Sequence, residues 1–313
     1  MRRSSCFQTS MNRNDPALRR SLGTRLRREL LHLLAITGQL WRVNFSVSTD
    51  LAGRRLRIPV LYGQGPQNLA LLEPGIFDAL EKTLSLRPGT VLDVGVNVGQ
   101  TLIKIKALDW ERRYVGFEIN PRCCQYVDAL IAANKFPECT VVPAGLSDRS
   151  GLATLWLRRT VSLDPSATTI SEVADNTDDL RPQCAAVCRG DDVVEALQIE
   201  TVAAIKIDTE GAELEVMRGL ADTIGRFRPF VICEILPVGD VTHPAARARL
   251  ARQRAVQALL TGWNYVLFRL HADGALEHVT DIGIHDDLSL TNYLAVPASA
   301  RDALDAAFIF RAA

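Results

Sequence analysis

Lysine, long apolar runs and net charge are scarce or absent in this sequence of 313 residues. Only five of its 36 basic residues are lysines, and 36 acidic residues bring the net charge to zero, so a globally basic nucleic-acid-binding protein is not indicated. The best apolar run, residues 30–41, is interrupted by His32, Thr37 and Gln39 and falls short of the ~20 residues of a membrane-spanning helix. The run lacks an obvious small-residue cleavage site, so no secretory signal is expected.

Metal-binding cysteine patterns are also missing. The seven cysteines include the neighbours Cys123 and Cys124 and the pair Cys184 and Cys188, but no C-x-x-C spacing. An odd number of cysteines in a long chain argues against a disulfide framework, and the spacing argues against a zinc site. We therefore expect buried thiols in a reducing cytoplasm and no bound metal.

The basic residues gather at the start of the chain. Residues 1–58 hold 12 Arg against Asp15, Glu29 and Asp50, a net charge of +9, so the rest of the chain carries −9. From Asp15 onward, leucines recur among arginines at helical spacing, which predicts a basic amphipathic helix. Such a helix can lie on an anionic membrane surface, bind a partner protein, or pack on the main domain with its arginines in water.

Helix and strand patterns alternate from about residue 74. We expect an N-terminal extension over residues 1–57, irregular structure over 43–73, and one domain over 58–313. The alternation predicts a mostly parallel sheet with helices on both faces. The expected strands are 91–94, 114–117, 140–142, 203–207, 230–235, 265–270 and 293–296, and the expected helices are 76–86, 98–108, 121–134, 212–224 and 245–260.

One segment interrupts this alternation. Strand-like residues 153–157 and 185–188 flank a polar stretch over 160–183. That stretch exceeds the length at which loops are usually either functional or disordered. The sequence leaves two interpretations open: a loop that covers the substrate, or a disordered surface insertion.

A glycine-rich turn follows the first expected strand of the domain, at Asp93-Val94-Gly95-Val96-Asn97-Val98-Gly99. The glycines allow a tight turn, and the next helix offers free N–H groups to a ligand. Glu118 ends the second strand, where a carboxylate can accept hydrogen bonds from both ribose hydroxyls. Ser147 and Asp148 follow the third strand, either near an adenine edge or as a turn cap. We predict that Asp93, Gly95, Asn97, Gly99, Glu118, Ser147 and Asp148 bind a nucleotide-like cofactor.

Acidic residues follow the next two strands. Asp208 ends the strand over 203–207, Glu210 comes two residues later, and Glu234 ends the strand over 230–235. A buried strand rarely ends in an unpaired carboxylate, so this edge is a candidate catalytic site. The three acids can share a proton, hold a metal or position a hydroxyl, and we favour a metal-free base because no D-x-D spacing is present. Mutual repulsion predicts a raised pKa for at least one of them.

These motifs resemble the FkbM family of S-adenosylmethionine-dependent methyltransferases. The resemblance implies a class I, Rossmann-like fold with seven strands in the order 3-2-1-4-5-7-6, the last antiparallel. It also implies S-adenosylmethionine as cofactor and O-methylation of a hydroxyl on a sugar, glycan or secondary metabolite. The stretches that carry it, in the order of the family, are 93–99, Gly116-Phe117-Glu118-Ile119-Asn120-Pro121, 142–148, Lys206-Ile207-Asp208-Thr209-Glu210-Gly211-Ala212-Glu213 and 292–297.

Two other functions fit parts of the pattern. An NAD-dependent oxidoreductase uses similar nucleotide geometry, but the G-x-N-x-G spacing and the lack of Tyr-x-x-x-Lys argue against it. A non-catalytic protein that binds cofactor or docks a partner is the other alternative. We expect a small-molecule or glycan acceptor, no nucleic acid, and a peripheral membrane or protein contact through the N-terminal helix.

Overall fold

The computed structural model describes residues 29, 31, 33, 34, 36–70, 72–158, 167–175 and 178–311. Most of the predicted basic helix therefore lies outside the described residues. No helix within the described part of the chain is long and apolar enough to cross a membrane.

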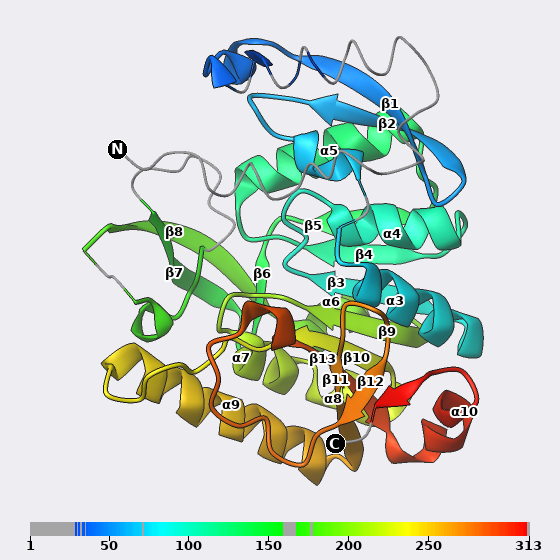
Figure 1. The fold of residues 1–313 in the computed structure, drawn as a ribbon, viewed down its shortest axis with the longest axis vertical. Helices are drawn as coiled ribbons and strands as arrows, with labels where there is room; N and C mark the ends of the chain where they lie inside the picture. The colour runs from blue at the N-terminus through cyan, green and yellow to red at the C-terminus, as the bar shows by residue number, and fades with distance from the viewer. Residues whose placement is uncertain are drawn as a thin grey trace.

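A mixed sheet forms the centre of the molecule (Figure 1), and nine of the strands found in the described ranges belong to it. Seven of them follow the predicted order 3-2-1-4-5-7-6, and the seventh in sequence is antiparallel to its neighbours, as predicted. These are, across the sheet, β5 (Cys139–Val142), β4 (Tyr114–Phe117), β3 (Thr90–Val94), β9 (Val202–Ile207), β10 (Phe230–Glu234), β13 (Asn292–Pro297) and β11 (Tyr265–Leu270). Two strands that were not predicted, β12 (Leu276–His278) and β14 (Phe310–Arg311), extend the sheet beyond β11.

Helices cover both faces of this sheet, and each face has its own apolar core. The first core packs α3 (Pro74–Leu86), α4 (Gln100–Leu108), α5 (Pro121–Asn134) and α10 (Arg301–Asp305) on one face. The second packs α6 (Gly190–Ala196), α7 (Glu213–Gly219), α8 (Ala221–Phe227) and α9 (Pro244–Gly262) on the other. Neighbouring strand residues such as Val91 and Leu92 belong to opposite cores, because side chains alternate across a strand.

The helix predicted over 212–224 is two helices, so this expectation was wrong. The chain leaves α7 at Gly219 and starts α8 after Leu220. A Cβ on Gly219 would lie 1.9 Å from the carbonyl oxygen of Ser147, so the close approach of these two backbone segments requires a glycine at position 219.

The prediction of irregular structure over 43–73 was also wrong. The strands β1 (Phe45–Leu51) and β2 (Arg54–Val60) form an antiparallel hairpin. Its two-residue turn, Ala52 and Gly53, has positive φ at both positions, the geometry that suits a tight hairpin. The hairpin packs beside α5, where the Tyr126 hydroxyl donates to the Pro59 carbonyl at 2.9 Å (Figure 1). The boundary expected between residues 57 and 58 falls inside β2.

A second, three-stranded sheet stands at one end of the main sheet (Figure 1). It consists of β6 (Gly145–Ser147), β8 (Leu180–Arg189) and β7 (Gly151–Arg158), in that order, and both long strands exceed their predicted lengths. Of the polar stretch over 160–183, residues 160–166, 176 and 177 lie outside the described residues. The described residue Thr168 pairs with Trp156 of β7 through two backbone hydrogen bonds of 2.8 and 3.1 Å.

The remaining short elements are η2 (Leu40–Arg42), η3 (Pro66–Leu69), η4 (Ser171–Val173), η5 (Leu288–Leu290) and η6 (Ala298–Ala300).

Candidate active site

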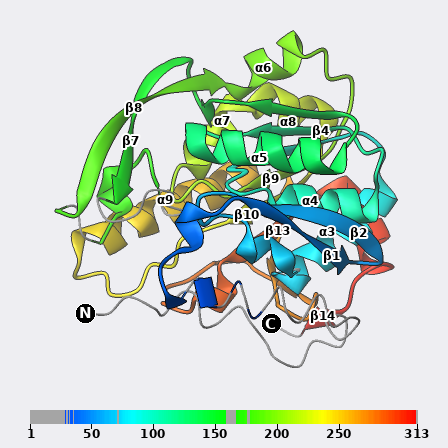
Figure 2. The same cartoon turned by 90° about the horizontal axis from the view of Figure 1, so that it is seen from above.

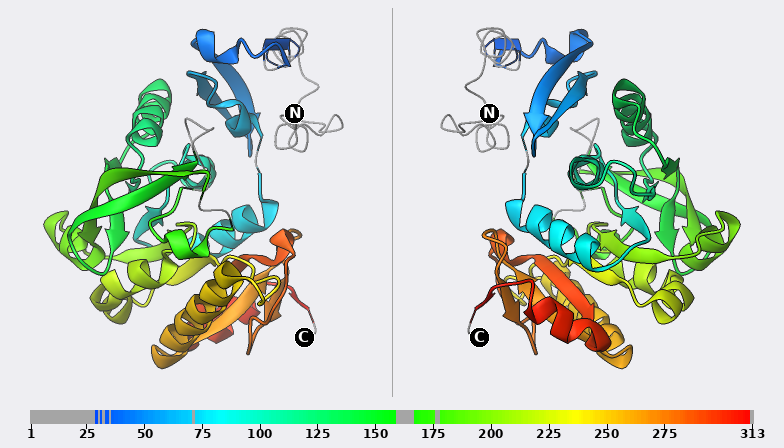
Figure 3. Two further views of the ribbon diagram at one scale, coloured as in Figure 1. Left: turned by 90° about the vertical axis from the view of Figure 1, so that its left-hand side faces the viewer. Right: turned by 90° about the vertical axis from the view of Figure 1, so that its right-hand side faces the viewer.

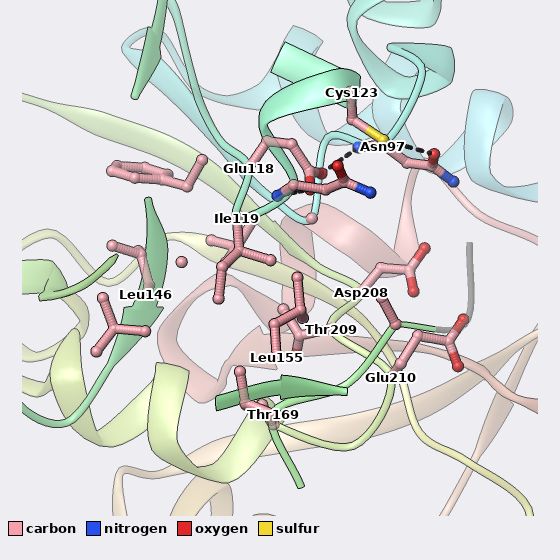
Figure 4. Close-up of a pocket in the computed structure, with 18 residues that line it drawn as sticks. Asn97, Glu118, Ile119, Cys123, Leu146, Leu155, Thr169, Asp208, Thr209 and Glu210 are labelled. Carbon is pink, nitrogen blue, oxygen red and sulfur yellow. Dashed lines mark hydrogen bonds between the residues drawn. The ribbon is translucent and has the colours of Figure 1, made fainter. Parts of the chain in front are cut away.

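A cleft of about 250 Å³ opens at the carboxyl ends of β3, β4 and β9, beneath the three-stranded sheet (Figure 4). This is the edge at which parallel α/β sheets bind ligands. Strand ends and loops from both sheets line it: Val94, Gly95, Asn97, Phe117, Glu118, Ile119, Asn120, Cys123, Gly145, Leu146, Leu155, Ala167, Thr169, Val187, Asp208, Thr209, Glu210 and Ala212.

Gly95 brings the first turn of the domain against the end of β9. A Cβ at this position would lie 1.8 Å from the Asp208 carbonyl oxygen, and the φ of Gly95 is +87°. The Asp208 amide donates to the Val94 carbonyl at 2.9 Å, which fixes the two strand ends together. Gly99 has a different place: a Cβ there would lie 2.9 Å from Leu130 on α5, and Gly99 does not line the cleft.

Glu118 enters the cleft from the end of β4 and is only 6% exposed. Its two carboxylate oxygens each accept one backbone N–H, from Asn97 at 2.6 Å and from Asn120 at 2.7 Å. Burial raises the pKa of Glu118 to about 7, although the two N–H donors act to lower it. A carboxylate has about four acceptor positions, so Glu118 keeps capacity for further hydroxyl donors.

Asp93 lies behind the cleft instead of lining it. Strand pleating turns its side chain toward the face covered by α4, where it is fully buried and accepts the Tyr114 hydroxyl at 2.6 Å. Burial raises the pKa of Asp93 to about 6, while the positive charge of Lys206 opposes the rise. Lys206 is its neighbour in register on β9. Asp93 therefore does not line the cleft, where its contact with the cofactor was predicted. It supports the end of β3 from behind, through Tyr114 and Lys206.

Ser147 and Asp148 also lie outside the cleft lining. The Ser147 hydroxyl bonds to Asp148 at 3.3 Å, and Asp148 lies 3.6 Å from the Arg149 guanidinium. The two residues before them, Gly145 and Leu146, line the cleft instead.

Apolar side chains that were not predicted form one part of the lining. Ile119 follows Glu118 directly, and Leu155 and Val187 come from β7 and β8 (Figure 4). Thr169, from the polar stretch over 160–183, completes this side. The described part of that stretch thus takes part in the cleft, as the first of its two interpretations requires.

A buried lysine organises the acidic edge. The Lys206 ammonium lies 2.5 Å from the Asp208 carboxylate, and Lys206 is buried. Burial alone would lower the pKa of Lys206, but the charges of Asp208 and Asp93 outweigh this and raise it. The lysine therefore stays protonated between two carboxylates.

Glu234 lies beside Asp208 and accepts the Thr291 hydroxyl at 3.0 Å. Burial, together with the negative charge of Asp208, raises the pKa of Glu234 to about 7. Burial is the larger cause, and the repulsion from Asp208 that the sequence led us to expect adds to it. Glu234 does not line the cleft itself, whereas Asp208 and Glu210 do.

The loop that carries Asp208 and Glu210 is held from below by Glu213. One oxygen of this buried carboxyl accepts the Gly211 amide at 2.9 Å and the Thr209 hydroxyl at 3.1 Å. Glu210 adopts a positive φ of 53° on this loop and points into the cleft region beside Asp208 (Figure 4). Within the described residues, no group of three or more His, Cys, Asp or Glu side chains is arranged to hold a metal ion.

The donor set of the cleft fits a nucleoside cofactor. Glu118 offers carboxylate oxygens to a ribose, and Ile119, Leu146 and Leu155 offer apolar surface to a base. A glycine is required at position 95, because a Cβ there would collide with the Asp208 carbonyl oxygen. Together with the strand order 3-2-1-4-5-7-6, these features define a class I methyltransferase fold.

The family assignment follows from a family profile described as "Methyltransferase FkbM domain", which matches residues 93–256, just over half of the chain. The chain belongs to the FkbM methyltransferase family, and its cofactor is S-adenosylmethionine. The resemblance drawn from the motifs is thereby confirmed. No curated protein matches the chain.

Solved methyltransferase structures are similar to this chain at low sequence identity and with TM-scores below 0.5. The methyltransferase FkbM of Methylobacillus flagellatus KT is 15% identical, with a TM-score of 0.41, and the match covers 66% of this chain and 43% of that one. This chain thus spans less than half of that relative. A SAM-dependent methyltransferase from Aquifex aeolicus is 9% identical (TM-score 0.38; 72% and 89% covered). Aeropyrum pernix fibrillarin, with bound S-adenosyl-L-methionine, is 13% identical (TM-score 0.38; 71% and 76% covered).

Proposed function

We propose that this protein O-methylates a hydroxyl group on a sugar, a glycan or a secondary metabolite. The observation that carries this proposal is Asp208 in the cleft lining, with Lys206 and Glu234 directly behind it. A hydroxyl must lose its proton during methylation, and this group of side chains can receive it. We propose a small molecule or a glycan as the methyl acceptor, and not a nucleic acid.

S-adenosylmethionine, when bound, supplies a methyl group on a sulfonium, which an oxygen nucleophile can attack. Glu118 holds the ribose end through its carboxylate oxygens, and the apolar lining holds the base. Asp208 lies at the carboxyl end of β9, inside the cleft, where it accepts the proton of the acceptor hydroxyl. Glu210 lies beside it and orients the same hydroxyl.

The neighbours of Asp208 set how many protons the acidic edge holds. Lys206 supplies a fixed positive charge at 2.5 Å. Glu234 is protonated below about pH 7 and ionised above it, because its pKa is about 7. Above this pH the carboxylate of Glu234 lies behind Asp208 and supports the uptake of the proton that the acceptor hydroxyl releases.

The test is direct detection of methyl transfer. The full chain is incubated with isotope-labelled S-adenosylmethionine and a panel of glycans and hydroxylated metabolites, and mass spectrometry locates the label. The proposal expects label on an oxygen, and transfer that is lost in Asp208→Asn while S-adenosylhomocysteine still binds. Label on nitrogen or carbon, or full transfer by Asp208→Asn, would overturn it.

A further inference from the structure

Residues 167–175, which we call the covering segment, contribute to the wall of the cofactor cleft. Ala167 and Thr169 of this segment line the cleft. The segment is anchored first on β7, where Thr168 and Trp156 exchange two backbone hydrogen bonds. This anchor holds only the start of the segment, so the position of its far end depends on other contacts.

The second anchor is Val173, at the end of η4. Its side chain is only 3% exposed, and a Cβ on Gly211 would lie 2.8 Å from it. Gly211 has a φ of +107° and belongs to the loop that carries Asp208 and Glu210. Val173 therefore packs directly against the loop that forms the acidic side of the cleft.

Arg249 of α9 holds this second anchor from outside. Its Nε donates to the Val173 carbonyl at 2.9 Å, and its guanidinium lies 2.9 Å from the Asp175 carboxylate. The Arg249 side chain is 16% exposed and that of Asp175 79%, so we expect the ion pair in water to contribute less than the bond to the carbonyl. η4, in green, lies beside α9, in dark yellow, in two perpendicular views (Figures 2 and 3).

Arg252 makes the corresponding contact with the acidic loop. Its Nε donates to the Gly211 carbonyl at 2.7 Å, and its guanidinium pairs with Glu215. Residues three apart on a helix lie on the same face, so Arg249 and Arg252 project from one face of α9. This face thus holds both the covering segment and the loop that carries Asp208.

We propose that Arg249 is a positioning residue for cofactor binding: it fixes the covering segment so that Ala167 and Thr169 stay in the wall of the cleft. Arg249 does not line the cleft itself, so it acts through Val173. Without Arg249 the segment keeps its anchor on β7 but loses a polar contact at its far end. The cleft then releases its ligand faster. This inference concerns the cofactor and is independent of the methyl acceptor.

Binding of S-adenosylhomocysteine to the full chain tests the proposal. Arg249→Met keeps an unbranched side chain but removes both contacts, so affinity should fall by about tenfold, mainly through faster dissociation. Arg249→Lys keeps one donor for the Val173 carbonyl and should recover most of this loss. Asp175→Asn should lose less than about twofold, because it removes only the exposed ion pair.

Arg254→Met is the matched control, because Arg254 is an exposed arginine on the same helix. It should bind S-adenosylhomocysteine like the wild type. Calorimetry gives the affinities and stopped-flow mixing gives the dissociation rates, while thermal unfolding checks that each variant is folded. A purely structural role of Arg249 would lower the unfolding temperature and leave the dissociation rate of the folded protein unchanged.

Hydrogen exchange gives a second readout that needs no variant. In the wild type, S-adenosylhomocysteine should slow amide exchange in residues 167–175, because these residues border the occupied cleft. In Arg249→Met the same amides should exchange faster than in the wild type. An unchanged dissociation rate in Arg249→Met, an equal effect of Arg254→Met, or no slowing of exchange by S-adenosylhomocysteine in the wild type would each overturn the proposal.

Discussion

The cofactor end of the cleft and the acidic edge beside Asp208 each have a glutamate whose pKa is raised to about 7 by burial, yet the partners of these glutamates differ in kind. Glu118 is held by two backbone N–H groups, which only donate hydrogen bonds. Glu234 accepts the Thr291 hydroxyl and lies near the negative charge of Asp208. Donors alone direct a carboxylate to accept more hydrogen bonds, whereas a neighbouring carboxylate raises its pKa by repulsion. Glu118 and Glu234 thus have similar pKa values but different functions, and the groups around each carboxyl distinguish the two.

The largest expected effect comes from Asp208→Asn, which tests the acceptor end. The substitution keeps the size of the side chain but removes the charge that accepts the hydroxyl proton, so turnover should fall by ~10²–10⁴-fold. Calorimetry with S-adenosylhomocysteine should show affinity within a few-fold of the wild type. Asp302→Asn, at an exposed position on α10, serves as control. A variant with full turnover would show that Asp208 is not the base.

Glu118→Ala tests the cofactor end. It removes charge-assisted hydrogen bonds to ribose, each worth ~1.5–3 kcal/mol, so affinity for S-adenosylhomocysteine should fall by roughly 10²-fold or more. Ser147→Ala is the matched comparison, because Ser147 lies outside the cleft lining and its loss should leave affinity nearly unchanged. If the two variants bind alike in calorimetry, the assignment of the ribose site to Glu118 fails.

The pH profile of turnover separates the two glutamates. Glu234 is protonated below about pH 7 and becomes an additional negative charge beside Asp208 above it, so turnover should rise as the pH increases through about 7. Glu234→Gln cannot titrate, so this rise should disappear and turnover at pH 8 should fall by about tenfold. Steady-state rates at saturating cofactor from pH 5.5 to 9 provide the measurement. A profile that keeps the rise in Glu234→Gln would assign it to another group.

The smallest effect is expected from Thr291→Val. The Thr291 hydroxyl lowers the pKa of Glu234 by donating to its carboxylate, so its removal should raise that pKa further. The rise in turnover should move to higher pH, with a loss of about twofold at pH 7. Cofactor affinity should not change, because Thr291 contacts only the acceptor end. An unshifted profile would mean that the hydrogen bond does not tune Glu234.

Much of the fold was predictable because buried parallel strands have a clear pattern. β3, β9 and β10 are mostly apolar runs, each with one charged residue at or next to its end, and their positions were predicted to within one residue. The β1–β2 hairpin was missed because the Gly and Pro residues of 43–73 are typical of irregular structure, although the polar residues of the hairpin alternate with its buried side chains, as in a half-buried strand.

The sequence by itself determined where the cleft lies and which strand ends carry Gly95, Glu118 and Asp208, because a polar residue after a buried strand must emerge at the ligand-binding edge. Only the tertiary structure decided the rest of the site. Pleating turned Asp93 away from the cleft and toward Lys206, and the packing of β7 and β8 supplied the apolar lining. The hydrogen bond from Thr291 to Glu234 joins residues 57 positions apart, and local sequence cannot encode such non-local contacts.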